Sequence, residues 1–210
     1  MGVVLVFGMQ EVVAQEPDGG GETPLKVANT EVGALLKLLG AKLEDGLTLR
    51  QFEDYQRHFS RVDHDGDGNH SKVEFIEKGT YMTPQARRGI FTAADADSDG
   101  LVTRAEYLLN RIITDEAKAI MQAMDGDRDR AVQREEFLKG AFLADGDRKR
   151  AAAVFEALDT NGDGETRIPE YLRVWGKWAR SGRKPAAERV SVLERKLRRK
   201  GEKSDRAKSK

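Results

Sequence analysis

The stretch Asp95-Ala96-Asp97-Ser98-Asp99-Gly100-Leu101-Val102-Thr103-Arg104-Ala105-Glu106 decides the fold of this 210-residue chain. It has acidic residues at its first, third, fifth and twelfth positions and glycine at its sixth. Three other stretches repeat the pattern with small changes, namely DHDGDGNHSKVE (63–74), DGDRDRAVQREE (125–136) and DTNGDGETRIPE (159–170). The four starts are 32, 30 and 34 residues apart. In chain order, the stretches are called loop one to loop four.

Apolar residues flank every loop at the same two positions. An aromatic or methionine lies four residues before each loop, at Phe59, Phe91, Met121 and Phe155. An aromatic follows each closing glutamate, at Phe75, Tyr107, Phe137 and Tyr171. Since residues four apart share a face of a helix, each loop is expected to lie between two amphipathic helices. Four repeats in register with these flanks exclude a chance run of acidic turns.

Each helix-loop-helix unit resembles an EF hand, the calcium-binding unit of the EF-hand superfamily. Calcium takes six to eight oxygen ligands at about 2.3–2.6 Å. In the family, positions 1, 3 and 5 give side chains, position 7 a carbonyl, position 9 a side chain or water, and position 12 a bidentate glutamate. Glycine at position 6 turns the chain with positive φ at no steric cost. Only 18 residues separate Glu106 from Asp125, so a compact arrangement without a long exposed connection is expected. Such an arrangement resembles sarcoplasmic calcium-binding proteins and their bacterial, calerythrin-like relatives.

The resemblance implies a set of oxygen ligands in each loop. Loop one would use Asp63, Asp65, Asp67, Asn69, Ser71 and Glu74. Loop two would use Asp95, Asp97, Asp99, Leu101, Thr103 and Glu106. Loop three would use Asp125, Asp127, Asp129, Ala131 and Glu136. Loop four would use Asp159, Asn161, Asp163, Glu165 and Glu170, with water replacing Arg167 at position 9.

Loop three departs from the pattern because Arg130 stands where glycine belongs. A left-handed conformation costs an L-residue about 1–2 kcal/mol, or about one power of ten in affinity. We therefore expect the chain to hold three or four calcium ions.

The expected fold is all-α, with two compact lobes that each contain a pair of EF hands. Residues 29–113 would form the first lobe and 114–180 the second. Capping residues predict where the entering helices begin: at Thr48 with Gln51, at Thr83 with Pro84, at Thr114 or Asp115, and at Asp147. An additional helix near Thr30–Leu43 is expected to pack on this body, and Trp175 and Trp178 to cap the core of the second lobe.

The N-terminal residues carry a weaker signal. Val3–Met9 is apolar, and Val12–Ala14 resembles a cleavage site, so residues 1–14 are interpreted as a signal peptide. That interpretation predicts a secreted, periplasmic or cell-envelope protein. No basic residue precedes Val3, so an ordinary apolar N-terminus of a cytoplasmic protein is the alternative. Residues 15–28 have the composition of a flexible linker.

Charge is balanced overall but divided between two parts of the chain. The sequence has 36 basic and 36 acidic residues. Residues 181–210 contain 12 basic and 4 acidic residues, a net of +8, which leaves −8 for the remainder. Residues 181–210 are predicted to be a solvated tail, partly helical or disordered, that touches the acidic body when calcium is absent. The alternative is an anchor for a partner protein or an anionic surface, with nucleic acid the least favoured.

Composition also limits the function. The absence of cysteine excludes disulfides and thiolate chemistry, and nearly every carboxylate of the repeats has a place in a loop. Neither an enzyme nor a small-molecule substrate is therefore expected. Promiscuous sensors line their groove with methionine, and only Met82, Met121 and Met124 follow the N-terminal segment. We expect a calcium buffer or calcium-stabilised body; the alternative is a sensor or adaptor whose apolar groove binds a partner.

The only histidines, His58, His64 and His70, lie around loop one. They are interpreted as incidental surface residues, with a zinc site as the alternative.

Overall fold

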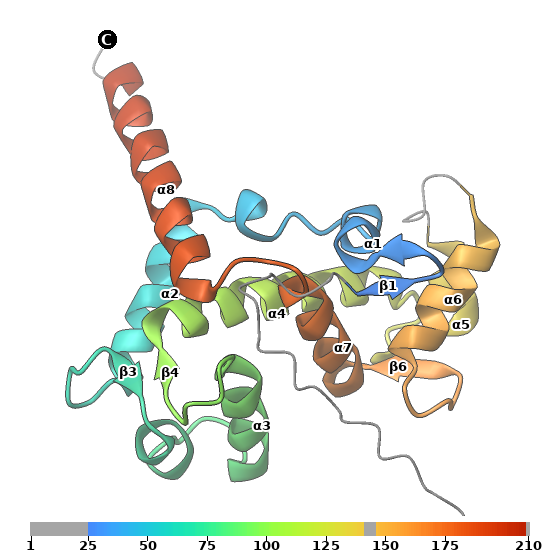
Figure 1. Ribbon diagram of the computed structural model, residues 1–210, viewed down its shortest axis with the longest axis horizontal. Helices are drawn as coiled ribbons and strands as arrows, with labels where there is room; N and C mark the ends of the chain where they lie inside the picture. The colour runs from blue at the N-terminus through green and yellow to red at the C-terminus, as the bar shows by residue number, and fades with distance from the viewer. Residues whose placement is uncertain (1–24, 141–145, 209–210) are drawn as a thin grey trace, which may run out of the picture.

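The computed structural model describes residues 25–140 and 146–208, which are mainly helical, as expected for an all-α protein (Figure 1). The described helices are α1 (Val32–Leu38), α2 (Leu49–Val62), α3 (Pro84–Ala94), α4 (Arg104–Met124), α5 (Arg134–Lys139), α6 (Arg148–Leu158), α7 (Ile168–Arg180) and α8 (Ala186–Lys208). Antiparallel ladders join β1 (Lys26–Val27) to β2 (Thr30–Glu31), β3 (Asn69–His70) to β4 (Val102–Thr103), and β5 (Ala131–Gln133) to β6 (Glu165–Arg167). A 3-10 turn (Leu43–Gly46) and a π turn (Val73–Glu77) complete the elements.

Three helix starts predicted from capping residues are confirmed. The Thr48 hydroxyl accepts a hydrogen bond from the Gln51 backbone N–H at 3.2 Å, and the Gln51 side chain accepts one from the Thr48 N–H at 3.1 Å. Thr83 caps α3 and Asp147 caps α6 in the same way, through side-chain oxygens that accept from backbone N–H groups. These oxygens satisfy donors that the first turn of a helix leaves unpaired.

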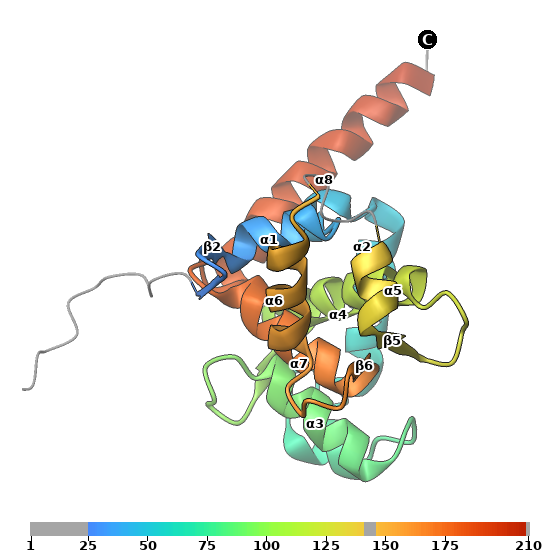
Figure 2. The same cartoon turned by 90° about the vertical axis from the view of Figure 1, so that its right-hand side faces the viewer.

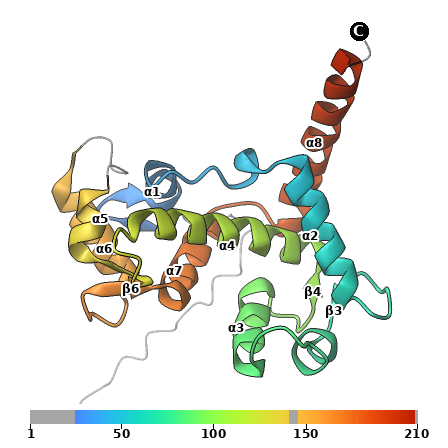
Figure 3. The same cartoon turned by 180° about the vertical axis from the view of Figure 1, so that it is seen from behind.

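Helix α4 runs through the middle of the molecule and joins loop two directly to loop three (Figures 1 and 3). It begins after Thr103, so the predicted helix start at Thr114 or Asp115 is wrong. The Thr114 hydroxyl bonds back to the carbonyl of Arg111 at 3.5 Å. The expected boundary between residues 113 and 114 therefore falls inside a continuous helix.

One large apolar core surrounds α4. Residues of α1, α2, α4, α6, α7 and α8 contribute to it, and Trp175 and Trp178 are buried within it, with 0% and 4% of their surface exposed. A second, smaller cluster contains Ile76, Phe91, Ala94 and Val102. The smaller cluster lies between α3, the π turn and β4, so this part of the fold is packed less extensively than the rest.

The N-terminal part of the described chain is held against the body. Residues 26–27 form β1, and the Leu25 N–H donates to the Ser181 hydroxyl at 2.8 Å. The flexible linker predicted for 15–28 is therefore wrong for residues 25–28; residues 15–24 and the predicted signal peptide lie outside the described residues. Helix α1 buries Val32, Leu35 and Leu36, which confirms that an additional helix packs on the body.

The predicted C-terminal tail is largely helical, and the first half of its helix packs on the body instead of being solvated. Helix α8 contacts α4, and its Val190, Leu193 and Leu197 are buried in the core. The rest of α8 extends away from the body (Figure 2). This part of α8 points away from the four loops (Figure 1). Nearer its start, α8 does contact acidic residues of the body, because Arg189 pairs with Glu44 and Lys196 with Asp45. That calcium loosens this contact stays a prediction. Among the residues described, no helix is both long enough and apolar enough to cross a membrane.

Candidate metal centres

Short ladders bring the four loops together in twos. In the first, Asn69 pairs with Thr103 and His70 with Val102, which joins loop one to loop two. In the second, the residues of β5 pair with those of β6, which joins loop three to loop four. Each ladder lies at positions 7 to 9 of its loops.

Every loop has left-handed backbone at positions 4 and 6. The φ values are 73° and 85° at Gly66 and Gly68, 61° and 88° at Ser98 and Gly100, 65° and 75° at Arg128 and Arg130, and 72° and 85° at Gly162 and Gly164. Loop three therefore follows the same path as the others, but with two arginines where glycine is favoured. The strain expected at Arg130 is present, and Arg128 is a second L-residue of this loop in the left-handed conformation.

The first residue of each loop receives the same hydrogen bond. The N–H at position 6 donates to Oδ2 of the aspartate at position 1, and the donor–acceptor pairs are Gly68–Asp63 (3.2 Å), Gly100–Asp95 (3.1 Å), Arg130–Asp125 (3.0 Å) and Gly164–Asp159 (3.0 Å). Because loop three makes this bond too, Arg130 does not prevent the loop from closing.

The closing glutamate folds back over each loop. Its Oε1 accepts the N–H of position 2, in the pairs Glu74–His64 (2.8 Å), Glu106–Ala96 (2.9 Å), Glu136–Gly126 (2.8 Å) and Glu170–Thr160 (2.8 Å). In loop one the N–H and hydroxyl of Ser71 donate to Oε2 of Glu74, and such bonds lower the pKa of Glu74 to about 2. A glutamate with this pKa is ionised at neutral pH and can bind a cation.

Positions 3 and 5 turn the chain through bonds between their carboxylates or amide and the backbone. The N–H groups at position 5 donate to Oδ1 at position 3, in the donor–acceptor pairs Asp67–Asp65, Asp99–Asp97, Asp129–Asp127 and Asp163–Asn161. The N–H groups at position 7 donate to Oδ1 at position 5, in the donor–acceptor pairs Asn69–Asp67, Leu101–Asp99, Ala131–Asp129 and Glu165–Asp163. These bonds use the Oδ1 atoms. In loops three and four the second oxygen at position 5 also accepts a hydrogen bond, Asp129 Oδ2 from the Gln133 amide at 2.8 Å and Asp163 Oδ2 from the Asn161 amide at 3.0 Å.

The side chain at position 9 of each loop makes a hydrogen bond to a carboxylate of the same loop. The Ser71 and Thr103 hydroxyls donate to the closing glutamates, at 2.7 and 2.8 Å. In loop three the Gln133 amide donates to Oδ2 of Asp129 at 2.8 Å. Arg167 of loop four reaches Oδ2 of Asp163 at 3.4 Å, as a cation beside the loop rather than a ligand.

Carboxylates converge in three of the loops. Oxygens of Asp63, Asp65 and Glu74, of Asp95, Asp97 and Glu106, and of Asp125, Asp127 and Glu136 lie within 4.8 Å of one another. In loop four the amide of Asn161 stands at position 3, so the corresponding group has one carboxylate fewer.

Two of these carboxylates have an oxygen without a hydrogen bond. Oδ1 of Asp95 and Oδ1 of Asp125 are buried and have no partner in the structure. In loops one and four the equivalent oxygens accept the N–H of Gly66 at 2.9 Å and of Gly162 at 2.8 Å. A buried, unpaired carboxylate oxygen is costly, and a bound cation removes that cost. The oxygen-only donor set therefore fits a hard cation such as calcium.

His70 lies beside loop one and is buried, so its predicted place at the surface is wrong. It was expected at the surface, but it is 0% exposed, and its Nε2 lies 2.9 Å from the carbonyl oxygen of Phe59. Its ring stacks on Phe59 at 4.1 Å, and burial lowers its pKa. The sequence feature that could have indicated its burial is its place at loop position 8, where an apolar residue packs beneath the ladder. His64 instead bonds the carbonyl of Val62, so the two imidazoles do not converge on a zinc site.

One comparison with known proteins gives a match, and it lies at loop four. A protein-family model described as EF hand matches residues 151–165, from within α6 to the first half of loop four. No curated protein matches the chain. The family match and the three carboxylate groups together support a place in the EF-hand superfamily and suggest calcium binding.

Proposed function

We propose that this protein binds calcium ions at all four loops and acts as a calcium buffer or a calcium-stabilised body. The observation that carries the proposal is the common closure of the loops. In each, the position-6 N–H binds the first aspartate and the closing glutamate binds the position-2 N–H. Four stretches of different sequence therefore close in the same way, and in three of them carboxylate oxygens lie within 4.8 Å of one another. EF-hand proteins are generally non-enzymatic, and we propose no catalytic role.

Loop three belongs to the proposed set in spite of its arginines. Arg130 has φ of 75°, close to the 85° of Gly68, and the Asp125 oxygen beside it is buried without a partner. The strain lowers affinity but leaves the oxygens in place. We therefore assign four sites, with loop three the weakest.

The packing favours a buffer or stabilised body over a sensor. A sensor opens a pair of helices and exposes an apolar groove, often rich in methionine. Here Met121 and Met124 are buried in the core. The apolar side chains of α1 and α8 lie in the same core, so they already cover the surfaces that a target helix would use. Calcium in about 1,000-fold excess over Kd would add about 4 kcal/mol of stability at each site.

The sensor remains the second candidate because of α8. This helix buries only three apolar side chains in its first half, and its remainder leaves the body (Figure 2). Release of α8 by calcium would uncover α4 and create a groove for a partner.

Two measurements test these proposals. Calorimetric titration of the metal-free chain with calcium should give heat that saturates at four ions; no heat up to millimolar calcium would contradict calcium binding. An apolar fluorescent dye added during the titration should show no increase in fluorescence. A calcium-dependent increase would overturn the buffer assignment in favour of the sensor.

A further inference from the structure

The outer side of α8 carries a row of cations. Val192, Arg195, Lys196, Arg199 and Lys200 follow the spacing that places residues on one side of a helix, and they line a shallow hollow of about 330 Å³. Val192 is 50% exposed and the four basic residues are exposed. Val190, Leu193 and Leu197 of the same helix are buried in the core, so α8 combines buried apolar residues with an exposed cationic row.

The basic residues of α8 are continued by others on α1 and beside the 3-10 turn. A second hollow of about 330 Å³ lies between α1, the 3-10 turn and α8, and it shares Val192 and Lys196 with the first. Together the two hollows are lined by nine cations and three carboxylates. The cations are Lys37, Lys42, Arg183, Lys184, Arg189, Arg195, Lys196, Arg199 and Lys200. We call this surface the cationic face.

The three carboxylates of the cationic face are already neutralised. Glu44 pairs with Arg189, Asp45 with Lys196, and Glu188 with Lys184. Among the described residues, no carboxylate forms an ion pair with the other cations of the face. The face therefore presents an excess of positive charge that the fold itself does not compensate.

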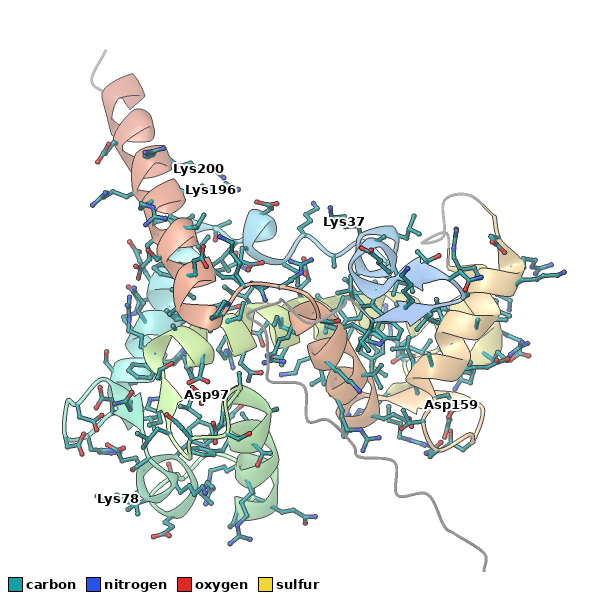
Figure 4. All side chains as sticks on the ribbon, in the orientation of Figure 1. Lys37, Lys78, Asp97, Asp159, Lys196 and Lys200 are labelled. Carbon is teal, nitrogen blue, oxygen red and sulfur yellow. The ribbon has the colours of Figure 1, made fainter. Side chains whose placement is uncertain are left out.

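The cationic face and the calcium loops lie on different sides of the molecule. Lys37, Lys196 and Lys200 lie along one side, whereas Asp97 and Asp159 of loops two and four lie along the other (Figure 4). An anionic partner can therefore approach the cationic face without meeting the acidic loops.

We propose that the cationic face binds the surface of an anionic phospholipid membrane. A negative membrane surface attracts Lys and Arg side chains, and their contributions add along a patch. The face extends from α8 onto α1, which suits a broad anionic surface better than a single strand of phosphates. No aromatic side chain lines either hollow in the described part of the chain, so the face lacks the stacking platform that single-stranded nucleic acid uses. The apolar side of α8 is buried, so the contact is electrostatic and does not insert the helix.

Vesicle sedimentation with the full chain tests the proposal. The chain should bind phosphatidylcholine vesicles that contain about 30% phosphatidylglycerol and should not bind vesicles of phosphatidylcholine alone. About 0.5 M salt should release it. The variant R195E/R199E should bind at least about 20-fold more weakly, since each basic residue contributes about a five-fold factor.

The variant K78E/R88E is the matched control. It makes the same change in charge at two exposed residues outside the cationic face, and it should bind like the wild type. Circular dichroism of both variants should give the wild-type spectrum and melting temperature. Equal binding of R195E/R199E and the control would overturn the proposal. So would equal binding to the two kinds of vesicle, or binding to duplex DNA without binding to anionic vesicles.

Discussion

The guanidinium of Arg180, at the end of α7, donates a hydrogen bond of 3.0 Å to the backbone carbonyl of Ala93, near the end of α3. The same nitrogen lies 2.8 Å from Oδ1 of Asn110 in α4, which is 5% exposed. Ala93 is two residues before Asp95, the first residue of loop two. The Arg180 side chain therefore links α7 to α3, the helix that enters loop two. A cation at the C-terminal end of a helix also suits the helix dipole.

Arg180→Ala should lower the free energy of unfolding by about 1–3 kcal/mol, because the buried Asn110 oxygen and the Ala93 carbonyl lose their donor. Urea unfolding followed by circular dichroism measures this change. Lys177→Ala is the control, because Lys177 is exposed on the same helix, and it should change stability by less than about 0.5 kcal/mol. Equal effects of the two substitutions would show that the Arg180 contacts add no stability.

Arg130→Gly should raise the calcium affinity of loop three by about ten-fold, because it removes the strain of a left-handed L-residue. Calorimetry should show the weakest of the sites become tighter. Arg130→Ala removes the same positive charge but keeps a side chain at positive φ, so it isolates the effect of charge. If Gly and Ala raise the affinity equally, backbone strain is not what weakens this loop.

Acid should destabilise the metal-free protein through His70. Burial lowers the pKa of His70 below its ordinary value of 6.5, so the unfolded chain binds a proton more readily than the folded one. The stability from neutral His70 is complete above pH 6.5 and declines as the pH falls below it. The melting temperature in chelator, measured at about pH 7.5 and about pH 5.5, should fall less for His70→Val than for the wild type. His58→Ala, at an exposed histidine, should keep the wild-type fall; an unchanged fall in His70→Val would refute the assignment.

Glu44→Gln should lower the free energy of unfolding by about 2–4 kcal/mol, because it leaves the guanidinium of Arg189 buried without its charge partner. The two side chains are only 20% and 7% exposed. Asp45→Asn breaks the exposed pair with Lys196 and should cost about 0–1 kcal/mol. Chemical unfolding at neutral pH measures both, and a loss for Glu44→Gln no larger than that for Asp45→Asn would contradict the prediction.

The ion pair between Glu44 and Arg189 also makes the stability of the protein depend on pH. Burial raises the pKa of Glu44, but the hydrogen bond and charge of Arg189 outweigh it, and the net pKa lies below the ordinary 4.5. The stability from this pair is present above pH 4.5 and is lost as the pH falls through the folded-state value.

Local signals in the sequence predicted much of the fold. The caps at Thr48, Thr83 and Asp147 act on N–H groups two or three residues away, so their effect is visible in a short stretch. The loop repeats likewise depend on residues within twelve positions. Thr114 and Asp115 resemble a cap as well, but α4 continues through them because its apolar face packs on α2, α7 and α8. The continuation of α4 through Thr114 and Asp115 therefore depends on packing between elements distant in the sequence. Residues close to Thr114 do not reveal that packing.

Burial of polar side chains was the main feature that the sequence did not reveal. The sequence around His70 suggests a surface residue. Its burial depends on Phe59, whose ring stacks on the imidazole and whose carbonyl oxygen lies within hydrogen-bond distance of Nε2. The partner surface of α8 on α4 lies far earlier in the chain, as the contact between Arg104 and Glu194, 90 residues apart, illustrates. The contacts of Arg180 were missed for the same reason.

The most direct test of calcium binding at these loops is a titration followed by amide NMR. The N–H groups of Gly68, Gly100, Arg130 and Gly164 each donate to the first aspartate of their loop, so calcium on that carboxylate must change their chemical shifts. We expect all four signals to move to new saturated positions, with Arg130 requiring the most calcium. If none of the four moves on addition of millimolar calcium, the loops do not bind calcium and the proposed function is wrong.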